Sequence, residues 1–232
     1  MLTLLTYPAT PTAFSLSPFC VKAAMLLARS GLPWQREDLS DPRRMPHQKL
    51  PVMKTEDRLI ADSDGIRDWL EAQGLDFDEG LNVQDRARAR ALTHMAEEHL
   101  YFHVVQDRWN NDAVWPAIRD SYFAAIPRLL RGPITSRLRK SVQRGLGFQG
   151  TARFAPHERL HRVDKDLRAV TDLLQDRPFL MGDAICSADL SMGPMLAAMA
   201  ETPVETDLTR RVTGDAELMG YIDRVREAAP LP

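Results

Sequence analysis

Ser17 and Cys20, whose side chains could take part in thiol chemistry, lie at the start of one predicted helix. Residues 15–20 read SLSPFC, and an apolar run with helical spacing follows them as far as Gly31. Ser17 is a typical N-cap, and Pro18 suits the first helical position, where its missing N–H is harmless. A helix N-terminus also stabilises an anion such as a thiolate. The stretch therefore predicts either a simple capped helix or a site that activates a thiol.

A second cluster of reactive side chains lies in the segment THMAEEHLYFH. His94 and Glu98 are four residues apart, and so are His99 and His103, a spacing that can hold zinc on a helix. Five residues separate the two pairs, which turns one from the other by about 140° around the helix axis. The pairs therefore point apart, and we expect histidines on an ordinary helix face and no metal.

The composition limits the classes of function. The chain has 232 residues, 44% of them hydrophobic and 27% charged, and a net charge of −2. These values suit one large or two modest globular domains and argue against a protein built to hold nucleic acid. Its two cysteines, Cys20 and Cys186, are too few for a disulfide framework and fit a reducing compartment. We find no apolar stretch long enough to span a membrane and no signal peptide, and we expect a cytoplasmic protein.

The elements that must position Ser17 mix strands and helices within residues 1–75. Their order is β-α-β, a loop, then β-β-α. The expected strands read LTLLTY, WQRED, PVMKT and RLIA. The expected helices are 18–31 and the segment DSDGIRDWLEAQG, with Asp62 or Ser63 as its cap.

The rest of the chain shows only helical spacing. Residues 76–83 form an acidic linker that contains glycine. Helices are expected at 84–110, 112–131, 156–176, 187–200 and 215–229. The sequence thus predicts an α+β protein of two domains, a small α/β domain (residues 1–75) followed by an all-α helical bundle (residues 84–232).

Several motifs resemble the glutathione transferase superfamily, whose first domain is thioredoxin-like. The segment MPHQKLPVM is similar to the family's Asn-Pro-x-Gly-Lys-Val-Pro-x-Leu, with Pro46, Lys49, Leu50 and Pro51 in register. SPF resembles the start of the first helix in tau-class enzymes, where omega-class proteins have Cys-Pro-Phe. SLSPFCVK, EEHLYFHVVQDRW and the region around PFLMGD look closest to the branch of metaxins and failed-axon-connections proteins. The resemblance covers nearly the whole chain and implies the glutathione transferase fold.

The resemblance also implies a glutathione site in the first domain. Leu50 and Pro51, with Pro51 in cis, would present an open backbone edge to the cysteinyl part of glutathione, and Lys49 lies beside them. Ser63, at the start of a helix, would receive the γ-glutamyl carboxylate, while Asp62 would face the α-amino group. Helix capping alone is the alternative for Asp62 and Ser63.

Ser17 is the residue that the resemblance places beside the sulfur of glutathione. Its hydroxyl and the helix dipole would lower the pKa of the thiol and so activate it, whereas a plain cap would have no catalytic task. Ser15 and Tyr7 are rivals for this role. Cys20 matches the second cysteine of a Cys-Pro-Phe-Cys motif that here begins with serine, so a dithiol cycle within the motif is excluded. We expect Cys20 to be a small buried residue.

A basic segment interrupts the helical half of the chain. Residues 121–157 contain seven arginines or lysines and no acid, with most of them in 128–144. We expect a solvated helix face, and a surface for phosphate, a membrane or a partner protein is the less favoured alternative.

Two hypotheses for the function follow. In the first, the protein is a glutathione transferase-like enzyme that directs the thiol of glutathione at a small hydrophobic electrophile. Tyr101, Arg108 and Trp109 would border the electrophile pocket, or else only pack in the core. In the second, it is a non-catalytic adaptor of metaxin-like type. The family resemblance implies a homodimer. The identity of the electrophile cannot be predicted from the sequence, because such pockets are lined by apolar side chains without a recognisable motif.

Overall fold

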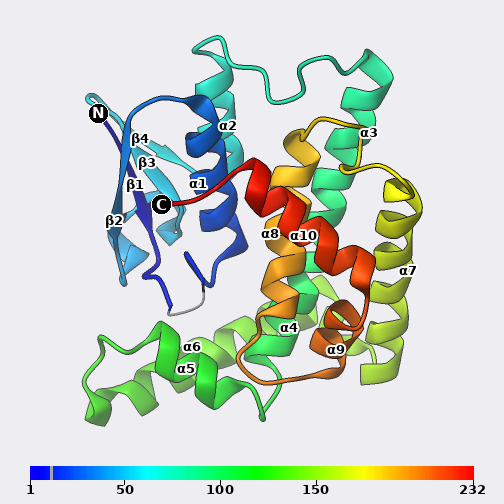
Figure 1. Ribbon diagram of the computed structural model, residues 1–232. Coiled ribbons are helices and arrows are strands. Elements are labelled where there is room, and N and C mark those ends of the chain that lie inside the picture. Colours follow the sequence, from blue (N-terminus) through cyan, green and yellow to red (C-terminus); the bar gives the residue numbers. More distant parts are fainter. Residues whose placement is uncertain (11–12) are drawn as a thin grey trace.

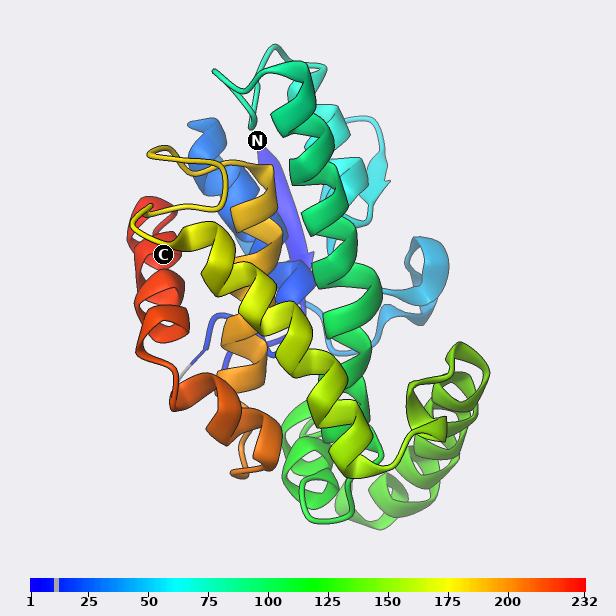
Figure 2. The same cartoon turned by 90° about the vertical axis from the view of Figure 1, so that its right-hand side faces the viewer.

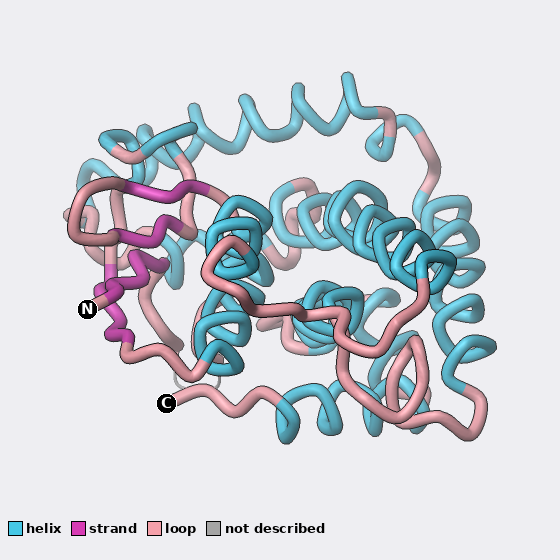
Figure 3. Tube along the Cα trace, turned by 90° about the horizontal axis from the view of Figure 1, so that it is seen from above, coloured by secondary structure: helices cyan, strands magenta, loops and turns pink. Residues whose placement is uncertain are grey.

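The computed structural model describes residues 1–10 and 13–232. Its N-terminal domain has a four-stranded sheet at one side of the molecule, and helices make up the remainder (Figures 1 and 3). The strands are β1 (Leu2–Thr6), β2 (Trp34–Asp38), β3 (Val52–Lys54) and β4 (Leu59–Ala61). Their order in the sheet is β2-β1-β3-β4; β1 and β2 are parallel, and the other two pairs are antiparallel. All four strands expected from the sequence are confirmed.

Two helices of the N-terminal domain pack together beside the sheet. The first is α1 (Pro18–Ser30), which ends at Gly31 in the left-handed conformation (φ 67°). The second is α2 (Ser63–Glu71), capped by Asp62. The connection between β2 and β3 has only two short 3₁₀ turns, Pro42–Arg44 and Pro46–Gln48. Helix α1 lies between the sheet and the second domain, and it packs against α8 (Figure 1).

The second domain is entirely helical. The first expected helix, 84–110, is observed as α3 (Val83–His94), a wider π-helical turn (Met95–Leu100) and α4 (Tyr101–Trp109) in direct succession (Figure 2). The others are α5 (Trp115–Tyr122), α6 (Arg128–Gln149), α7 (Pro156–Leu174), α8 (Ser187–Ala200), α9 (Asp207–Thr213) and α10 (Ala216–Ala228). The expected α+β fold, an α/β domain followed by a helical domain, is confirmed.

The region after α4 differs from the sequence prediction. A single helix over 112–131 is wrong, because the chain leaves helical geometry between Tyr122 and Arg128 and then forms the 22-residue α6. Pro133 is the sixth residue of α6, where its missing N–H removes one hydrogen bond from the ladder near the start of the helix. The short helix α9 was also not expected.

The centre of the second domain is α8, of which thirteen of fourteen residues are buried. At its N-terminus the carboxylate of Asp189, fully buried, accepts hydrogen bonds from the N–H of Leu180 (3.0 Å) and of Cys186 (2.9 Å). The hydroxyl of Tyr221 on α10 donates to the same carboxylate at 2.7 Å. Asp189 thereby joins the start of α8 to the preceding loop and to the C-terminal helix.

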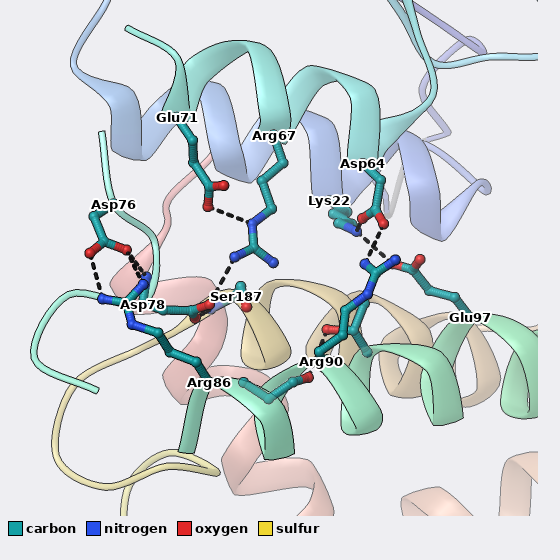
Figure 4. Close-up of polar contacts among 12 residues, drawn as sticks. Lys22, Asp64, Arg67, Glu71, Asp76, Asp78, Arg86, Arg90, Glu97 and Ser187 are labelled. Atoms are coloured by element: carbon teal, nitrogen blue, oxygen red, sulfur yellow. Dashed lines mark hydrogen bonds and ion pairs between the residues drawn. The ribbon is translucent and has the colours of Figure 1, made fainter. Parts of the chain in front are cut away.

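Charged side chains cross-link the two domains where α1 and α2 face α3 (Figure 4). Lys22 of α1, only 2% exposed, contacts Asp64 of α2 at 2.6 Å and Glu97 of the π-helical turn at 2.7 Å. Arg90 of α3 pairs with the other oxygen of Asp64 at 2.6 Å. Farther along, Arg67 pairs with Asp78 at 2.8 Å (Figure 4). The boundary between the domains at residues 76–83 remains a prediction.

No helix in residues 1–10 and 13–232 combines the length and the apolar character needed to cross a bilayer.

Candidate functional site

Ser17 is the N-cap of α1. Its backbone is extended (φ −92°, ψ 115°), and its Oγ accepts a long hydrogen bond, 3.4 Å, from the N–H of Cys20. The first turn of α1 contains no acidic residue. The side chain is only partly buried, so the hydroxyl hydrogen is free to be donated at the positive end of the helix.

The Leu50–Pro51 peptide bond is cis. This confirms the conformation expected from the sequence. Among the described residues, neither the N–H nor the C=O of Leu50 has a hydrogen-bond partner. Leu50, Cys20 and Val52 share one small hydrophobic cluster, which brings this segment to the first turn of α1. The backbone beside Ser17 is therefore an open edge that can pair with an extended peptide-like ligand.

Asp62 and Ser63 adjoin this edge. The N–H of Asp62 donates to the carbonyl of Pro51 at 3.2 Å, and the Asp62 carboxylate is exposed and accepts from the N–H of Asp64 at 2.9 Å. Ser63 is fully buried, and its hydroxyl has no hydrogen-bond partner in the described residues. A buried hydroxyl without a partner costs about 1–3 kcal/mol, which a ligand oxygen at the start of α2 would recover.

Lys49 is exposed just before the cis bond, and its side chain has no partner among the described residues. Its ammonium group can therefore turn to an anionic ligand lying along Leu50. The structure thus brings four predicted segments to one patch: Ser17, Lys49, Leu50–Pro51 and Asp62–Ser63. This donor set fits glutathione, which has two carboxylates, one ammonium group and a peptide backbone.

Cys20 does not compete with a bound thiol. It is fully buried, and burial raises the pKa of its thiol, an effect that the neighbouring Thr6, Ser17 and Ser15 only partly offset. Its expected role as a small buried residue is confirmed.

Of the two rivals of Ser17, Ser15 is engaged in the turn before α1, whereas Tyr7 packs beside Cys20 and Leu50 and its hydroxyl has no hydrogen-bond partner in the described residues. Ser15 is 5% exposed, and its Oγ accepts from the N–H of Ser17 at 3.3 Å, which shapes the turn before α1. Burial raises the pKa of Tyr7, as do the neighbouring Cys20 and Tyr101, so its hydroxyl stays protonated at neutral pH.

Arg108 holds the chain that carries Ser17, a role that the sequence did not reveal. This side chain of α4 is 3% exposed and donates to the carbonyl of Leu16 at 2.5 Å and to that of Ala198 at 2.6 Å. The hydroxyl of Tyr122 also donates to Leu16, at 3.2 Å. The residue next to Ser17 is thus fixed by the second domain. No carboxylate pairs with Arg108 within the described chain.

Lys22 is a second residue whose importance the sequence reasoning missed. A signal was present, because it is the only charged residue in an otherwise apolar helical run from Pro18 to Ala28. A lysine is almost never fully buried unless it is paired, so its partners had to come from other elements.

Aromatic side chains pack in pairs near the first turn of α1 and the end of β1. Phe19 packs edge-on against Tyr101 with ring centroids 4.7 Å apart, and Tyr7 packs against Tyr122 at 6.4 Å. Burial raises the pKa of Tyr101 to about 12. Trp109 instead stacks on Tyr122 and Trp115, in a satellite core.

A separate apolar cavity of about 220 Å³ lies on another side of α1. Pro18, Val21 and Met25, which share one face of α1, line it together with Arg108 and residues of α8 and α10. Phe19 points 100° away from Pro18 around the helix, so this cavity and the aromatic group border different faces of α1.

The histidine cluster is structural. His99 pairs with Asp166 of α7 and packs edge-on against His103. Burial lowers the pKa of His103 to about 4, so it stays neutral at physiological pH. The described residues contain no group of three His, Cys, Asp or Glu side chains that could hold a metal ion.

Comparison with known proteins agrees with this architecture. Residues 18–114 match the model of the glutathione S-transferase N-terminal domain, and residues 163–225 match that of the glutathione S-transferase C-terminal domain. The isoprene-epoxide–glutathione S-transferase of Rhodococcus sp. (strain AD45) is 28% identical over 226 residues, which cover 91% of this chain and 92% of that protein. Failed axon connections of Drosophila melanogaster is 25% identical over 95% of this chain and 56% of its own length.

The fold has close counterparts among solved structures. Glutathione transferase GSTFuA3 from Phanerochaete chrysosporium superimposes with a TM-score of 0.70 at 16% sequence identity, over 100% of this chain and 98% of that one. Both domains, in the same order, and the fold over the full length thus agree, and the chain belongs to the glutathione S-transferase superfamily.

Proposed function

We propose that this protein is a glutathione transferase that binds glutathione at the patch around Ser17 and activates its thiol there. The observation that carries the proposal is the meeting of the capped start of α1, the open cis-Pro51 edge and the unpartnered hydroxyl of Ser63. The family's relatives, among them an enzyme named for an epoxide and glutathione, support glutathione transferase activity.

Each part of glutathione has a partner in this proposal. The cysteinyl backbone pairs with Leu50 as an added strand, and the γ-glutamyl carboxylate binds Ser63 and the N-terminus of α2. Asp62, exposed at that position, faces the α-amino group, and Lys49 faces an anionic end. The sulfur then lies at the start of α1, where Ser17 donates a hydrogen bond to the thiolate.

The electrophile is a small hydrophobic molecule, and an alkene epoxide is the first to assay, because the Rhodococcus relative bears that name. The thiolate forms a bond to an epoxide carbon, the C–O bond breaks, and the resulting alkoxide takes a proton. Tyr7 packs beside Cys20 and Leu50, Tyr101 packs on Phe19, and both remain protonated at neutral pH, so their hydroxyls are candidates to donate to the epoxide oxygen.

The proposal has a direct binding test. Glutathione should stabilise the protein by about 2.7 kcal/mol at a hundred times its dissociation constant, seen as a rise in Tm. Retention on glutathione-agarose and conjugation of an epoxide, followed by loss of glutathione, would extend this to activity. No thermal shift at millimolar glutathione would overturn the proposal and favour a non-catalytic adaptor.

The quaternary state and the location are also proposals. A homodimer is the arrangement common in the superfamily, and light scattering at micromolar concentration tests it. A cytoplasmic location would suit Cys20 and Cys186, which are both free thiols.

A further inference from the structure

Helix α6 lies at one end of the molecule with most of its surface uncovered. It forms the lower edge of the views in Figures 1 and 2, together with α5. Of its 22 residues only Thr135 and Leu146 are buried. A helix of globular proteins normally buries a continuous stripe, so an exposed face of this length calls for an explanation.

One face of α6 is attached to the body by polar contacts. Its side chains are spaced four residues apart: Arg131, Thr135, Arg139 and Gln143. Arg139 donates to the carbonyl of Trp109 at 2.7 Å and lies over the ring of Trp115, and Gln143 donates to the side chain of Asn110 at 3.0 Å. These contacts fix which side of the helix faces outward.

The outward side carries a concentration of exposed apolar side chains. Nine large hydrophobic residues are exposed in the described chain, and five of them belong to α6. They are Leu129 (93% exposed), Leu130 (57%), Ile134 (48%), Leu138 (41%) and Phe148 (87%). Leu130, Ile134 and Leu138 follow one another at intervals of four and so form one stripe.

A basic stripe runs beside this apolar stripe. Arg137 and Arg144 are seven residues apart and thus on one face, with Lys140 between them. Together with Arg128, these side chains make no ion pair or hydrogen bond with any described residue. The whole segment 121–157 contains no acid to neutralise them.

Charge argues against a second copy of α6 as the occupant of this face. Antiparallel pairing about the midpoint of the helix would bring Arg137 and Lys140 of both copies together, and like charges in contact are destabilising. An anionic surface that also accepts aliphatic side chains satisfies both stripes. A bilayer of anionic lipid is such a surface, because exposed Lys and Arg side chains on an amphipathic helix are attracted to its phosphates.

We propose that the outward face of α6 binds the surface of anionic membranes. The helix, about 33 Å long, lies in the plane of the interface, with the Leu130–Ile134–Leu138 stripe and Phe148 among the acyl chains. Arg137, Lys140 and Arg144 contact lipid phosphates. The helix does not span the bilayer, and the protein is recruited reversibly.

The test is co-flotation of the purified protein with vesicles. We expect binding to vesicles of phosphatidylcholine with 30% phosphatidylglycerol, weakened by high salt, and little binding to phosphatidylcholine alone. Arg137→Gln with Arg144→Gln should weaken binding by roughly 25-fold, at about fivefold for each charge. Leu130→Ser with Ile134→Ser should also release the protein from the anionic vesicles.

Matched variants elsewhere control for charge and hydrophobicity in general. Arg44→Gln with Arg177→Gln removes two exposed arginines, and Val83→Ser removes an apolar side chain on α3 that is even more exposed than Leu130 and Ile134. These variants should bind as the unaltered protein does. Circular dichroism checks that every variant is folded.

A label reports which face meets the lipid. Both natural cysteines are buried, so Ser141→Cys on α6 and Ser40→Cys in the first domain can each carry one environment-sensitive dye. We expect a blue shift on anionic vesicles only at position 141. The proposal is overturned if anionic vesicles do not bind, or if both positions respond alike. It is also overturned if the α6 variants only convert a dimer to a monomer and leave vesicle binding intact.

Discussion

The N-termini of α1 and α8 differ in charge compensation: a buried carboxylate neutralises the start of α8, whereas no acidic side chain does so at the start of α1. At α8 the carboxylate of Asp189 is fully buried and accepts three hydrogen bonds, so the positive end of the helix is already neutralised. At α1 the cap is Ser17, partly exposed and holding one long hydrogen bond, with no acid in the first turn. The difference teaches that the same helix end can serve stability when it is closed and anion binding when it is open.

The N-terminus of α2 contains both a paired carboxylate, as at α8, and a hydroxyl that is available to a ligand, as at α1. Asp64 in its first turn is paired with Lys22 and Arg90, whereas the hydroxyl of Ser63 has no partner. One side of this helix start thus joins the domains, and the other faces the proposed glutathione site.

The largest expected effect is a loss of stability when Asp189 at the N-terminus of α8 is replaced. Asp189→Ala leaves the N–H groups of Leu180 and Cys186 and the hydroxyl of Tyr221 buried without a partner, so we expect a loss of about 3–5 kcal/mol in unfolding free energy. Urea unfolding measures it. Asp183→Ala, in the exposed part of the same loop, is the control and should change little.

Arg108→Met tests whether Arg108 anchors the segment before Ser17 at the start of α1. The carbonyls of Leu16 and Ala198 would lose their charged donor and keep only the longer hydrogen bonds from the hydroxyls of Tyr122 and Thr202, at a cost of about 2–4 kcal/mol in unfolding free energy. The segment before Ser17 would also loosen, so we expect kcat for conjugation to fall more than the affinity for glutathione. Arg119→Met, on the surface of α5, controls for loss of an arginine; equal effects of the two changes would refute the anchoring role.

Ser63→Ala separates ligand binding from stability. We expect the dissociation constant of glutathione to rise by about 10- to 100-fold, the usual loss of a hydrogen bond to a charged group. Stability without glutathione should stay the same or increase, since the hydroxyl has no partner there. Ser187 is a matched control, because it is equally buried and unpartnered at the first position of α8. Ser187→Ala should leave the affinity unchanged, and calorimetry would reveal any departure.

The stability that Asp64 contributes through its ion pairs with Lys22 and Arg90 should depend on pH. Burial alone would raise its pKa, but Lys22 and Arg90 outweigh burial and lower the pKa to about 2. A lowered pKa gives stability that is present above about pH 4 and is lost as the pH falls toward 2. Asp64→Asn should therefore cost about 2 kcal/mol at pH 7, with a deficit that vanishes near pH 2. Acid titrations of unfolding should show no such trend for Asp68→Asn, on the same helix.

Sequence reasoning succeeded where the signal was local. The strands and the Ser17 cap each follow from a few adjacent residues, and the cis bond at Pro51 follows from the resemblance of the segment around it to the family motif. It failed where partners are distant, because Arg108 is 92 residues from Leu16, and Glu97 is 75 from Lys22. The predicted helix 112–131 ran through Pro127, before which the chain leaves helical geometry, and ended ahead of Pro133, which is tolerated inside α6.

The central claim is that Ser17 stabilises the thiolate of bound glutathione. The most direct measurement is the ultraviolet absorbance of that thiolate as a function of pH, for the unaltered protein and for Ser17→Ala, with Ser15→Ala as the control. We predict that Ser17→Ala raises the pKa of the bound thiol by about one unit, or ~1.4 kcal/mol, while glutathione still binds and the lost cap costs about 1 kcal/mol of stability. Superimposable titrations of the unaltered protein and Ser17→Ala would contradict the account and leave Ser17 as a cap only.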